Sequence, residues 1–364
     1  MGQPLRVGLV GAGNISAQYL ATFDRLADLE LVAVADLDLE RARSVAEQHG
    51  AVGLKVPELL SRDDVDAVVN LTVPAAHADV SLAAVAAGKG VYVEKPLAAT
   101  TAAATQMLDA ASAAGVVLGG APDTVLGTGV QTARSAVDGG AIGIPTSAMA
   151  TMVTPGHERW HPAPDFYYQP GGGPLLDMGP YYITALVTLL GPVVRVIGAA
   201  SALRDERVIG SGPRAGTRIP VSTPSHVTGA LVHASGAIST LLMSFDAVAS
   251  RAANIEVHGT EGSLAVPDPN HFAGTVSVAT TEDPAWRELP VSAGYRGAAR
   301  GYGLADLLWE GAFASDPTAG RAQGVVAFHV LEVMEGVLEA AREGRSVEIT
   351  STVERPAAVP LDDR

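Results

Sequence analysis

Two glycines near the N-terminus stand where a nucleotide phosphate would bind. The segment VGLVGAGNISAQYL places Gly11 and Gly13 directly after an apolar run and before a stretch of helical periodicity. The first glycine permits a tight turn, and the second lets the backbone approach a pyrophosphate at a helix N-terminus. Asn14 and Ile15 follow in the same turn and are expected to bind the cofactor as well. Ser16 takes the third glycine position, where glycine or alanine is usual.

An acidic residue, Asp36, follows the second apolar run about 20 residues further along, where a carboxylate binds adenosine ribose hydroxyls. Its charge would repel the 2′-phosphate of NADP, and Leu37 stands where a phosphate-binding side chain often follows. These residues favour NAD, while Arg41 and Arg43 keep NADP as an alternative. Asp36 could instead cap the next helix. Because the apolar run, the glycines and the acid are in register, we predict dinucleotide binding.

The first third of the chain alternates short β-branched runs with alanine-rich helical segments. Continuous apolar runs bounded by turn residues are typical of strands buried on both faces, as in a parallel sheet. The expected strands are 5–11, 30–36, 66–72, 90–95 and 115–121. The segments between them have helical periodicity and end at glycine. This alternation predicts an α/β fold with a doubly wound Rossmann sheet, in a dinucleotide-binding domain over residues 1–121.

The chain changes character after Pro122. We expect a helix over 126–139, a strand near 146–153 and then a long loop rich in proline, glycine and aromatic residues. Strands then follow one another without helices, with a hairpin turn at 234–236, which predicts a mostly antiparallel sheet. Two helices, 303–314 and 323–343, precede an extended tail. Residues 122–364 are therefore predicted to form a second α/β domain with a large open sheet.

Composition limits the classes of function. The chain has 364 residues, 48% of them hydrophobic, which is enough for two domains. Only 17% are charged, below the ~25% of typical soluble domains, which favours burial of further surface in a homo-oligomer. The formal net charge of −15 keeps the protein soluble and disfavours nucleic acid or an anionic membrane as a partner. The absence of cysteine excludes disulfides, thiolate nucleophiles and cysteine-ligated zinc.

We expect a cytoplasmic protein without a membrane segment. The N-terminal residues MGQPLRVGLVGAG lack a basic region followed by a long apolar run and a cleavage site. The most apolar window, 183–203, is interrupted by Gly191, Pro192 and Arg195. That window therefore indicates a buried helix, a turn and a strand.

Four further motifs accompany the glycine fingerprint: NLTVPAAHADV (70–80), GVYVEKPLA (90–98), GGGPLLDMG (171–179) and VHGTEGSL (257–264). Together they resemble the Gfo/Idh/MocA family of sugar and polyol oxidoreductases, over essentially the whole chain. Glu-Lys-Pro is the most specific signature. The resemblance implies a Rossmann domain followed by an α/β domain whose open sheet lines the substrate site and often forms the subunit interface. It also implies a metal-free site and a homodimer or homotetramer formed through that sheet.

Lys95 ends the fourth expected strand, at the carboxyl edge where ligands bind in doubly wound sheets. Oxidation of a secondary alcohol requires its proton to leave as well as the hydride, so a proton-transfer group must lie within reach. The Lys95 ammonium could polarise a carbonyl or stabilise an alkoxide. An isolated lysine there would more simply be a surface side chain, but the Glu-Lys-Pro motif favours catalysis. Glu94 would pair with the lysine or orient the nicotinamide, and Pro96 fixes the turn.

A loop beside the cofactor is implied by the same resemblance, and it contains Asn70, Thr72, Pro74 and His77. Thr72, Pro74 and His77 are expected to bind the cofactor together with Glu94 and Lys95. His77 would be structural or adjacent to the cofactor rather than catalytic.

Many family members carry D-x-G-x-H-x-x-D in mid-chain, with the aspartate and the histidine both in the site. Here Asp177 retains the aspartate, Tyr181 replaces the histidine and Thr184 replaces the second aspartate. The tyrosine narrows the resemblance to the branch containing glucose–fructose oxidoreductase and the dimeric dihydrodiol and xylose dehydrogenases. A phenol with a pKa of about 10 is a weak base, but a neighbouring ammonium favours its phenolate, so Lys95 and Tyr181 could exchange the substrate proton. Alternatively, Tyr181 packs in the core and Tyr182 or water carries the proton.

The loop TPGHERWHPAPDFYYQPGGG combines flat aromatic faces with polar groups, as sugar sites require. The expected substrate-binding residues are Trp160, His161, Asp165, Tyr168, Asp177, Tyr181 and Lys95. His157, Glu158 and His161 match no zinc-helix spacing, so no metal is expected. Glycines 171–173 are expected to pack closely near the substrate. Asp268 and Arg300 are weaker substrate candidates.

These residues predict an NAD(P)-dependent oxidoreductase that acts on a sugar, polyol or glycoside. Hydride would pass between a substrate carbon and nicotinamide, Lys95 and Tyr181 would handle the proton, and Asp177 would orient a hydroxyl. The first alternative is a hydrolase or lyase that uses bound NAD for transient oxidation during glycoside cleavage. A second is a cofactor-binding scaffold without turnover, against which the intact Lys95 argues.

Overall fold

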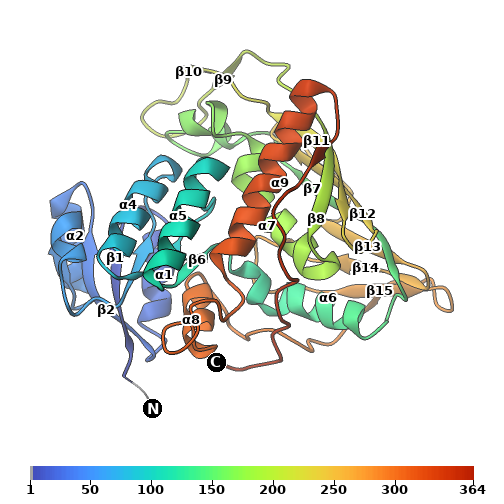
Figure 1. The fold of residues 1–364 in the computed structure, drawn as a ribbon. Helices are drawn as coiled ribbons and strands as arrows, with labels where there is room; N and C mark the ends of the chain where they lie inside the picture. Colours follow the sequence, from blue (N-terminus) through green and yellow to red (C-terminus); the bar gives the residue numbers. More distant parts are fainter. Residues whose placement is uncertain (1–2) are drawn as a thin grey trace. The chain divides into compact units, whose positions relative to one another are not determined.

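The structure, a computed structural model, describes residues 3–364, which form two compact units (Figure 1). The first unit comprises the chain up to Leu126 together with Gly297–Leu331. The second comprises Gly127–Arg296 and Glu332–Arg364. The expectation about the N-terminal segment begins at Met1 and Gly2, which lie outside the described residues.

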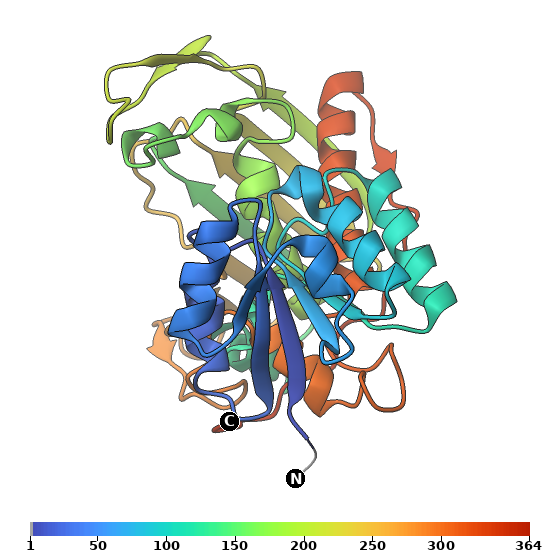
Figure 2. The ribbon, with the colours of Figure 1, turned by 90° about the vertical axis from the view of Figure 1, so that its left-hand side faces the viewer.

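The first unit contains a six-stranded parallel sheet in the order β3-β2-β1-β4-β5-β6. Its strands are β1 (Leu5–Val10), β2 (Leu29–Ala35), β3 (Val52–Leu54), β4 (Ala67–Asn70), β5 (Gly90–Val93) and β6 (Leu118–Gly120). Its helices are α1 (Ser16–Phe23), α2 (Leu39–Gln48), α3 (Val56–Leu60), α4 (Pro74–Ala86) and α5 (Thr101–Ala114). Figure 2 shows the strands side by side and flanked by helices. This order is that of a dinucleotide-binding sheet, so the predicted doubly wound fold is confirmed.

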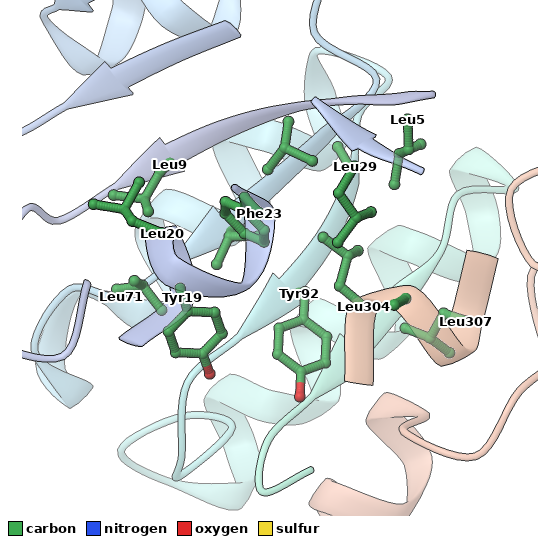
Figure 3. Close-up of a cluster of buried hydrophobic side chains, with 14 of the residues drawn as sticks. Leu5, Leu9, Tyr19, Leu20, Phe23, Leu29, Leu71, Tyr92, Leu304 and Leu307 are labelled. Atoms are coloured by element: carbon green, nitrogen blue, oxygen red, sulfur yellow. The ribbon is translucent and has the colours of Figure 1, made fainter. Parts of the chain in front are cut away.

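The core of this unit follows from the apolar strands. All four residues of β4 and of β5 are buried, as expected for strands covered on both faces. Figure 3 shows Leu9, Tyr19 and Tyr92 in the resulting cluster, which also contains Leu304 and Leu307. The last two belong to α8 (Tyr302–Trp309). The first unit therefore recruits residues 297–331, whereas the predicted second domain ran without interruption from 122 to 364.

The second unit contains a nine-stranded sheet in the order β16-β15-β14-β13-β7-β12-β11-β8-β17. Its strands are β7 (Pro145–Val153), β8 (Val193–Ser201), β11 (His226–His233), β12 (Ile238–Ser244), β13 (Ile255–Gly259), β14 (Gly262–Val266), β15 (Ser277–Thr280), β16 (Arg287–Glu288) and β17 (Val347–Glu348). Strands β7 and β12 pair in parallel, and the other neighbouring pairs are antiparallel. A separate ribbon pairs β9 (Glu206–Val208) with β10 (Arg218–Pro220). The predicted mostly antiparallel sheet is therefore confirmed.

Helix α7 (Pro174–Leu190) packs against β7, β11 and β12 and next to α6 (Thr128–Asp138) (Figure 1). It begins with a proline at its first position, where the missing N–H costs no helical hydrogen bond. The preceding loop contains two short 3₁₀ turns, η2 (His157–Arg159) and η3 (Asp165–Tyr168). The long helix α9 (Gly324–Glu343) contributes its residues from Glu332 onward to this unit.

Candidate active site

The glycine fingerprint forms an open turn between β1 and α1. Gly11 has a φ of +99°, and a Cβ there would lie 2.7 Å from the main-chain carbonyl of Leu71, so only glycine fits. A Cβ at Gly13 would meet no atom of residues 3–364 within 4 Å. Ser16 begins α1, and its hydroxyl donates to the Gly13 carbonyl (2.7 Å), which closes the turn. The open space beside Gly13 fits a pyrophosphate at the start of the helix.

Asp36 is held by three donors just after β2. Its Oδ2 accepts the Ala12 N–H (2.8 Å), and its Oδ1 accepts the Asp38 N–H (2.9 Å) and the Arg41 guanidinium (3.1 Å). The cap of α2 is Asp38, whose side chain accepts from the N–H groups of Glu40 and Arg41. Asp36 is therefore not the cap of α2. Its carboxylate is fixed beside the glycine turn, where a ribose would bind.

Two aliphatic side chains are left in solvent at the same edge of the sheet. Leu37, after β2, is fully exposed, and Val73, after β4, is 66% exposed. Their strands flank β1 on either side. Large exposed apolar side chains often mark a ligand-binding surface.

The loop after β4 is tied to the Glu-Lys-Pro turn by buried polar groups. Asn70 donates to the His77 carbonyl (3.0 Å) and accepts from the Thr72 hydroxyl (2.7 Å). The ring nitrogens of His77 face the carbonyl oxygens of Pro96 (2.7 Å) and Thr72 (3.0 Å). Burial lowers the pKa of His77, although both carbonyl contacts oppose that effect. His77 was expected to contact the cofactor, but its two nitrogens are engaged with main chain, so we assign it to positioning this loop.

Lys95 lies two residues beyond the end of β5, at the carboxyl edge of the sheet. Its main-chain N–H donates to Glu94 Oε2 (2.7 Å), and the Tyr19 hydroxyl donates to Glu94 Oε1 (2.9 Å). Glu94 is buried, and these two donors fix its carboxylate. The Lys95 backbone is therefore anchored from α1, at the edge where ligands bind in sheets of this type.

The two tyrosines of this core allow a matched test of that anchor (Figure 3). Tyr19→Phe should lower the free energy of unfolding by about 1.5–3 kcal/mol, because it removes a hydrogen bond to a buried carboxylate. Tyr92→Phe should be neutral or stabilising by about 1 kcal/mol, because the buried Tyr92 hydroxyl has no hydrogen-bond partner in the described part of the chain. Urea unfolding of both variants measures the difference. Equal losses in the two variants would contradict the proposed role of the Tyr19–Glu94 bond.

Helix α7 presents Asp177 in its first turn and Tyr181 one turn later, on the same face. The positive end of the helix dipole stabilises a carboxylate at that position. Asp177 Oδ2 lies 3.1 Å from His157 Nε2. Tyr181 is 5% exposed.

Tyr182, the alternative proton carrier, follows Tyr181 in the helix and projects about 100° further around its axis. Its hydroxyl accepts from Asn254 Nδ2 (2.8 Å) and donates to Asp268 Oδ1 (3.3 Å). Burial raises the pKa of Tyr182. This hydroxyl is therefore engaged with the protein, which makes Tyr182 a poor proton carrier. Asp268, a weaker substrate candidate, accepts the hydrogen bond from Tyr182, so we assign it a structural role instead.

The aromatic loop divides into accessible and buried residues. Trp160 is 58% exposed and lies edge-to-face with His161 (5.4 Å between ring centroids). Asp165, in contrast, receives two hydrogen bonds from Arg214 (2.6 and 2.9 Å), which lowers the pKa of Asp165. Tyr168 is fully buried, and its hydroxyl donates to Glu158. We therefore reassign Asp165 and Tyr168, expected to bind substrate, to holding the loop in place.

The glycine run before α7 is packed against main chain. A Cβ at Gly172 would collide with the carbonyl of Phe166, and one at Gly173 would lie 2.8 Å from the carbonyl of Pro224. Gly173 also has a φ of +90°. Close backbone packing is therefore what Gly172 and Gly173 provide, whereas a Cβ at Gly171 would meet no atom of residues 3–364 within 4 Å.

Comparison with known proteins identifies the family. Residues 5–120 match the model described as an oxidoreductase family with an NAD-binding Rossmann fold, and residues 130–265 match the GFO/IDH/MocA C-terminal domain. The chain is 32% identical over 269 residues to the 1,5-anhydro-D-fructose reductase of Ensifer adhaerens, an alignment that covers 71% of this chain and 74% of that protein. The chain belongs to the GFO/IDH/MocA oxidoreductase family. The predicted family, enzyme class and NAD-binding fold are therefore confirmed.

Other family members match over different shares of their length. A dTDP-3,4-didehydro-2,6-dideoxy-alpha-D-glucose 3-reductase of Streptomyces violaceoruber is 36% identical over 210 residues, which cover 57% of this chain and 60% of that enzyme. The match therefore spans less than two thirds of that relative.

Among solved structures, an NAD binding oxidoreductase from Klebsiella pneumoniae has a TM-score of 0.83 at 23% identity, covering 95% of this chain and 99% of that one. Levoglucosan dehydrogenase in complex with NADH and L-sorbose has a TM-score of 0.79 at 22% identity, covering 97% and 100%. These two structures share the fold of the chain.

The three residues considered as metal ligands, His157, Glu158 and His161, form hydrogen bonds with different partners. His157 contacts Asp177, Glu158 contacts Tyr168 and Arg207, and His161 accepts the Ala163 N–H. Over residues 3–364, no three histidine, aspartate or glutamate side chains are grouped to hold a metal. In the same part of the chain, no helix is long and apolar enough to cross a membrane.

Sequence reasoning missed two contacts that organise the site. Arg300, considered as a substrate candidate, is buried 3.9 Å from Asp123 in the first unit. His157 was considered only as a metal ligand, yet it contacts Asp177. No spacing signal identifies that pair, because the two residues meet only when the loop folds back onto the start of α7.

Proposed function

We propose that this enzyme transfers a hydride between nicotinamide and a secondary alcohol or ketone of a sugar, polyol or glycoside. The observation that supports it best is the start of α7, where Asp177, held by His157, and Tyr181 share one helix face. The adjacent exposed Trp160 offers a flat apolar surface of the kind that stacks on sugar C–H groups. The relatives named as reductases or dehydrogenases of sugars support the same substrate class.

The roles follow from the chemistry of each residue. When bound, NAD supplies the acceptor or donor of hydride. The glycine turn at Gly11 and Gly13 would hold its pyrophosphate, and Asp36 would bind the adenosine ribose. Lys95 stabilises negative charge on the substrate oxygen, and Tyr181 exchanges the proton of that oxygen. Asp177 accepts a hydrogen bond from a neighbouring hydroxyl and so orients the substrate.

Cofactor preference is tested at Asp36. Asp36→Ala should weaken NAD binding by about 1.5–3 kcal/mol, the value of hydrogen bonds to a charged group, or about 10- to 100-fold. NADP binding should weaken far less, because the substitution removes a repulsive charge and frees Arg41, now 3.1 Å from Asp36, to meet a 2′-phosphate. Asp36→Asn is the matched control, since it retains an acceptor for the Ala12 N–H. Fluorescence titration with NADH and NADPH measures both affinities, and a wild type that binds NADPH more tightly would refute the preference for NAD.

We propose a homodimer or homotetramer formed through the sheet of the second unit. Met149, Ile197 and Ile238 are each about half exposed. The strand register places all three on one face of β7, β8 and β12. Such an apolar face is typical of a subunit interface. Light scattering should give a mass of two or four chains, and a monomer would contradict this proposal.

The activity is tested by mixing the enzyme with NAD and a panel of sugars, polyols and glycosides. We expect an increase in the absorbance of reduced nicotinamide with at least one of them, and the reverse change with the matching ketone and NADH. Release of an aglycone without net NADH would instead support glycoside cleavage. Absence of any change across the panel, with NAD binding intact, would support a scaffold.

A further inference from the structure

His157 lies in η2, twenty residues before Asp177, yet the two side chains are in direct contact. Its Nε2 is 3.1 Å from Asp177 Oδ2. The two side chains are only 12% and 16% exposed. A hydrogen bond shielded from water in this way restrains a carboxylate more strongly than one on the surface.

The imidazole ring is surrounded by aromatic rings. The ring centroids of Phe245, Tyr167 and Trp160 lie 4.4, 4.7 and 5.2 Å from that of His157. Phe245 directly follows β12, so the histidine is packed between the sheet and the substrate loop. These contacts hold the ring in one orientation.

The residues on both sides of His157 are anchored as well. The buried Glu158 carboxylate accepts from the Tyr168 hydroxyl and from Arg207 Nη1 (3.2 Å). Gly156 has a φ of +110°, and any side chain there would collide with the Glu158 carboxylate. The loop can therefore place His157 in only a narrow range of positions.

The second ring nitrogen shows which tautomer this site favours. His157 Nδ1 is buried and has no hydrogen-bond partner among residues 3–364. A proton on Nδ1 would leave a buried N–H without an acceptor, which costs more than an unpaired lone pair on a neutral ring. The favoured tautomer therefore carries its proton on Nε2, which donates to Asp177, with the carboxylate as acceptor. A hydrogen bond to an ionised acceptor is stronger than one between neutral groups.

We propose that His157 is a positioning residue of the reaction: its Nε2–H holds the Asp177 carboxylate in the orientation that receives a substrate hydroxyl. This inference rests on the proposed function, in which Asp177 orients the substrate. It adds a residue outside α7 to those that support the reaction, and it explains why the aromatic loop contains a histidine at this position. Substitution of His157 should then disturb turnover through Asp177.

Two substitutions separate the hydrogen bond from the packing. His157→Phe keeps an aromatic ring among its neighbours and removes the donor, whereas His157→Gln keeps an amide donor near the Nε2 position and removes the ring. We expect His157→Phe to lower kcat by about 10- to 100-fold, the usual cost of a misplaced reacting group, with NADH affinity unchanged. His157→Gln should recover most of kcat. The reverse pattern, with an active Phe variant and an inactive Gln variant, would show a packing role and overturn the proposal.

Combining His157→Phe with Asp177→Asn tests whether His157 affects turnover through Asp177. If His157 acts through Asp177, adding His157→Phe to Asp177→Asn should lower kcat little further. Independent, additive losses would overturn the proposal.

A readout that needs no substrate keeps this inference separate from the proposed function. Nitrogen-15 NMR of histidine-labelled enzyme, with the His157 signal assigned by its loss in His157→Phe, should show the Nε2–H tautomer. The signal should shift in Asp177→Ala. An Nδ1–H tautomer, or a signal unaffected by Asp177→Ala, would overturn the contact even if no sugar is turned over. Failure of the sugar panel with the expected NMR result would instead reject only the proposed substrate class.

Discussion

Lys95→Met should lower kcat by about 10³-fold, within the range of general acid–base contributions, and leave the affinity for NAD unchanged. Methionine has a similar length but no ammonium, so the substrate oxygen loses the positive charge that stabilises an alkoxide or polarises a carbonyl. The local backbone should survive, because the hydrogen bond from the Lys95 main-chain N–H to Glu94 does not involve the substituted side chain. Steady-state kinetics with the best sugar and NADH titration measure the two effects.

Lys89→Met is the matched control for this prediction. Lys89 directly precedes the same strand, β5, and its ammonium donates to the Arg62 carbonyl (2.6 Å). Its loss should leave kcat as in the wild type. A Lys95→Met enzyme that retains its rate, or a Lys89→Met enzyme that loses as much, would remove Lys95 from the mechanism.

Tyr181→Phe has the second-largest expected effect, a loss of about 10²-fold in kcat, because the phenol is proposed to exchange the substrate proton. Phenylalanine keeps the aromatic ring of this buried residue, and the glycine turn and Asp36, which are proposed to bind NAD, are unchanged, so NAD binding should be retained. Tyr182→Phe is the adjacent control. Its hydroxyl binds Asn254 and Asp268, so its removal should lower the unfolding midpoint and leave kcat nearly unchanged.

Combining Lys95→Met with Tyr181→Phe shows whether the two residues serve the same proton. If they do, the double variant should be little slower than Lys95→Met alone, since residues that act as a unit are strongly non-additive. Losses that multiply would indicate separate roles. A Tyr181→Phe enzyme with the wild-type rate would leave Tyr181 as a core residue and return proton transfer to water or another group.

The Rossmann sheet was predictable because its inner strands β4 and β5 are fully buried. A strand covered on both faces must be apolar at every position, and such a run is visible without knowledge of its neighbours. The short edge strand β3 was missed for the same reason. It has only three residues, includes a glycine and is partly exposed, so no apolar run marks it.

The recruitment of residues 297–331 into the first unit was also missed. The helical pattern of α8 is clear in the sequence, and periodicity correctly indicated a helix there. Periodicity reports which face of a helix is buried, but it does not say which sheet covers that face. The close approach of Leu307 to Gly119 of β6 depends on the three-dimensional path of the chain.

Site residues were predictable from the sequence where a characteristic residue type follows the end of a strand. Those in the aromatic loop were less predictable. Gly13 and Asp36 lie where the fingerprint placed them, around an open turn. Trp160 and Tyr168 look equivalent in the sequence, yet one is exposed and the other fully buried. The buried Tyr168 hydroxyl donates a hydrogen bond to Glu158, and this partner accounts for the difference in exposure. A hydrogen bond between distant side chains produces no periodic pattern in the sequence.

Deuterium transfer tests the central claim most directly. A sugar that reduces NAD in the panel would be labelled with deuterium at the carbon to be oxidised, and both products would be analysed by mass spectrometry. Net hydride transfer predicts one deuterium on each reduced nicotinamide and one keto sugar for each NADH, at a rate that falls sharply in Lys95→Met. A cleaved glycoside that keeps its deuterium, with no reduced nicotinamide released, would contradict the account.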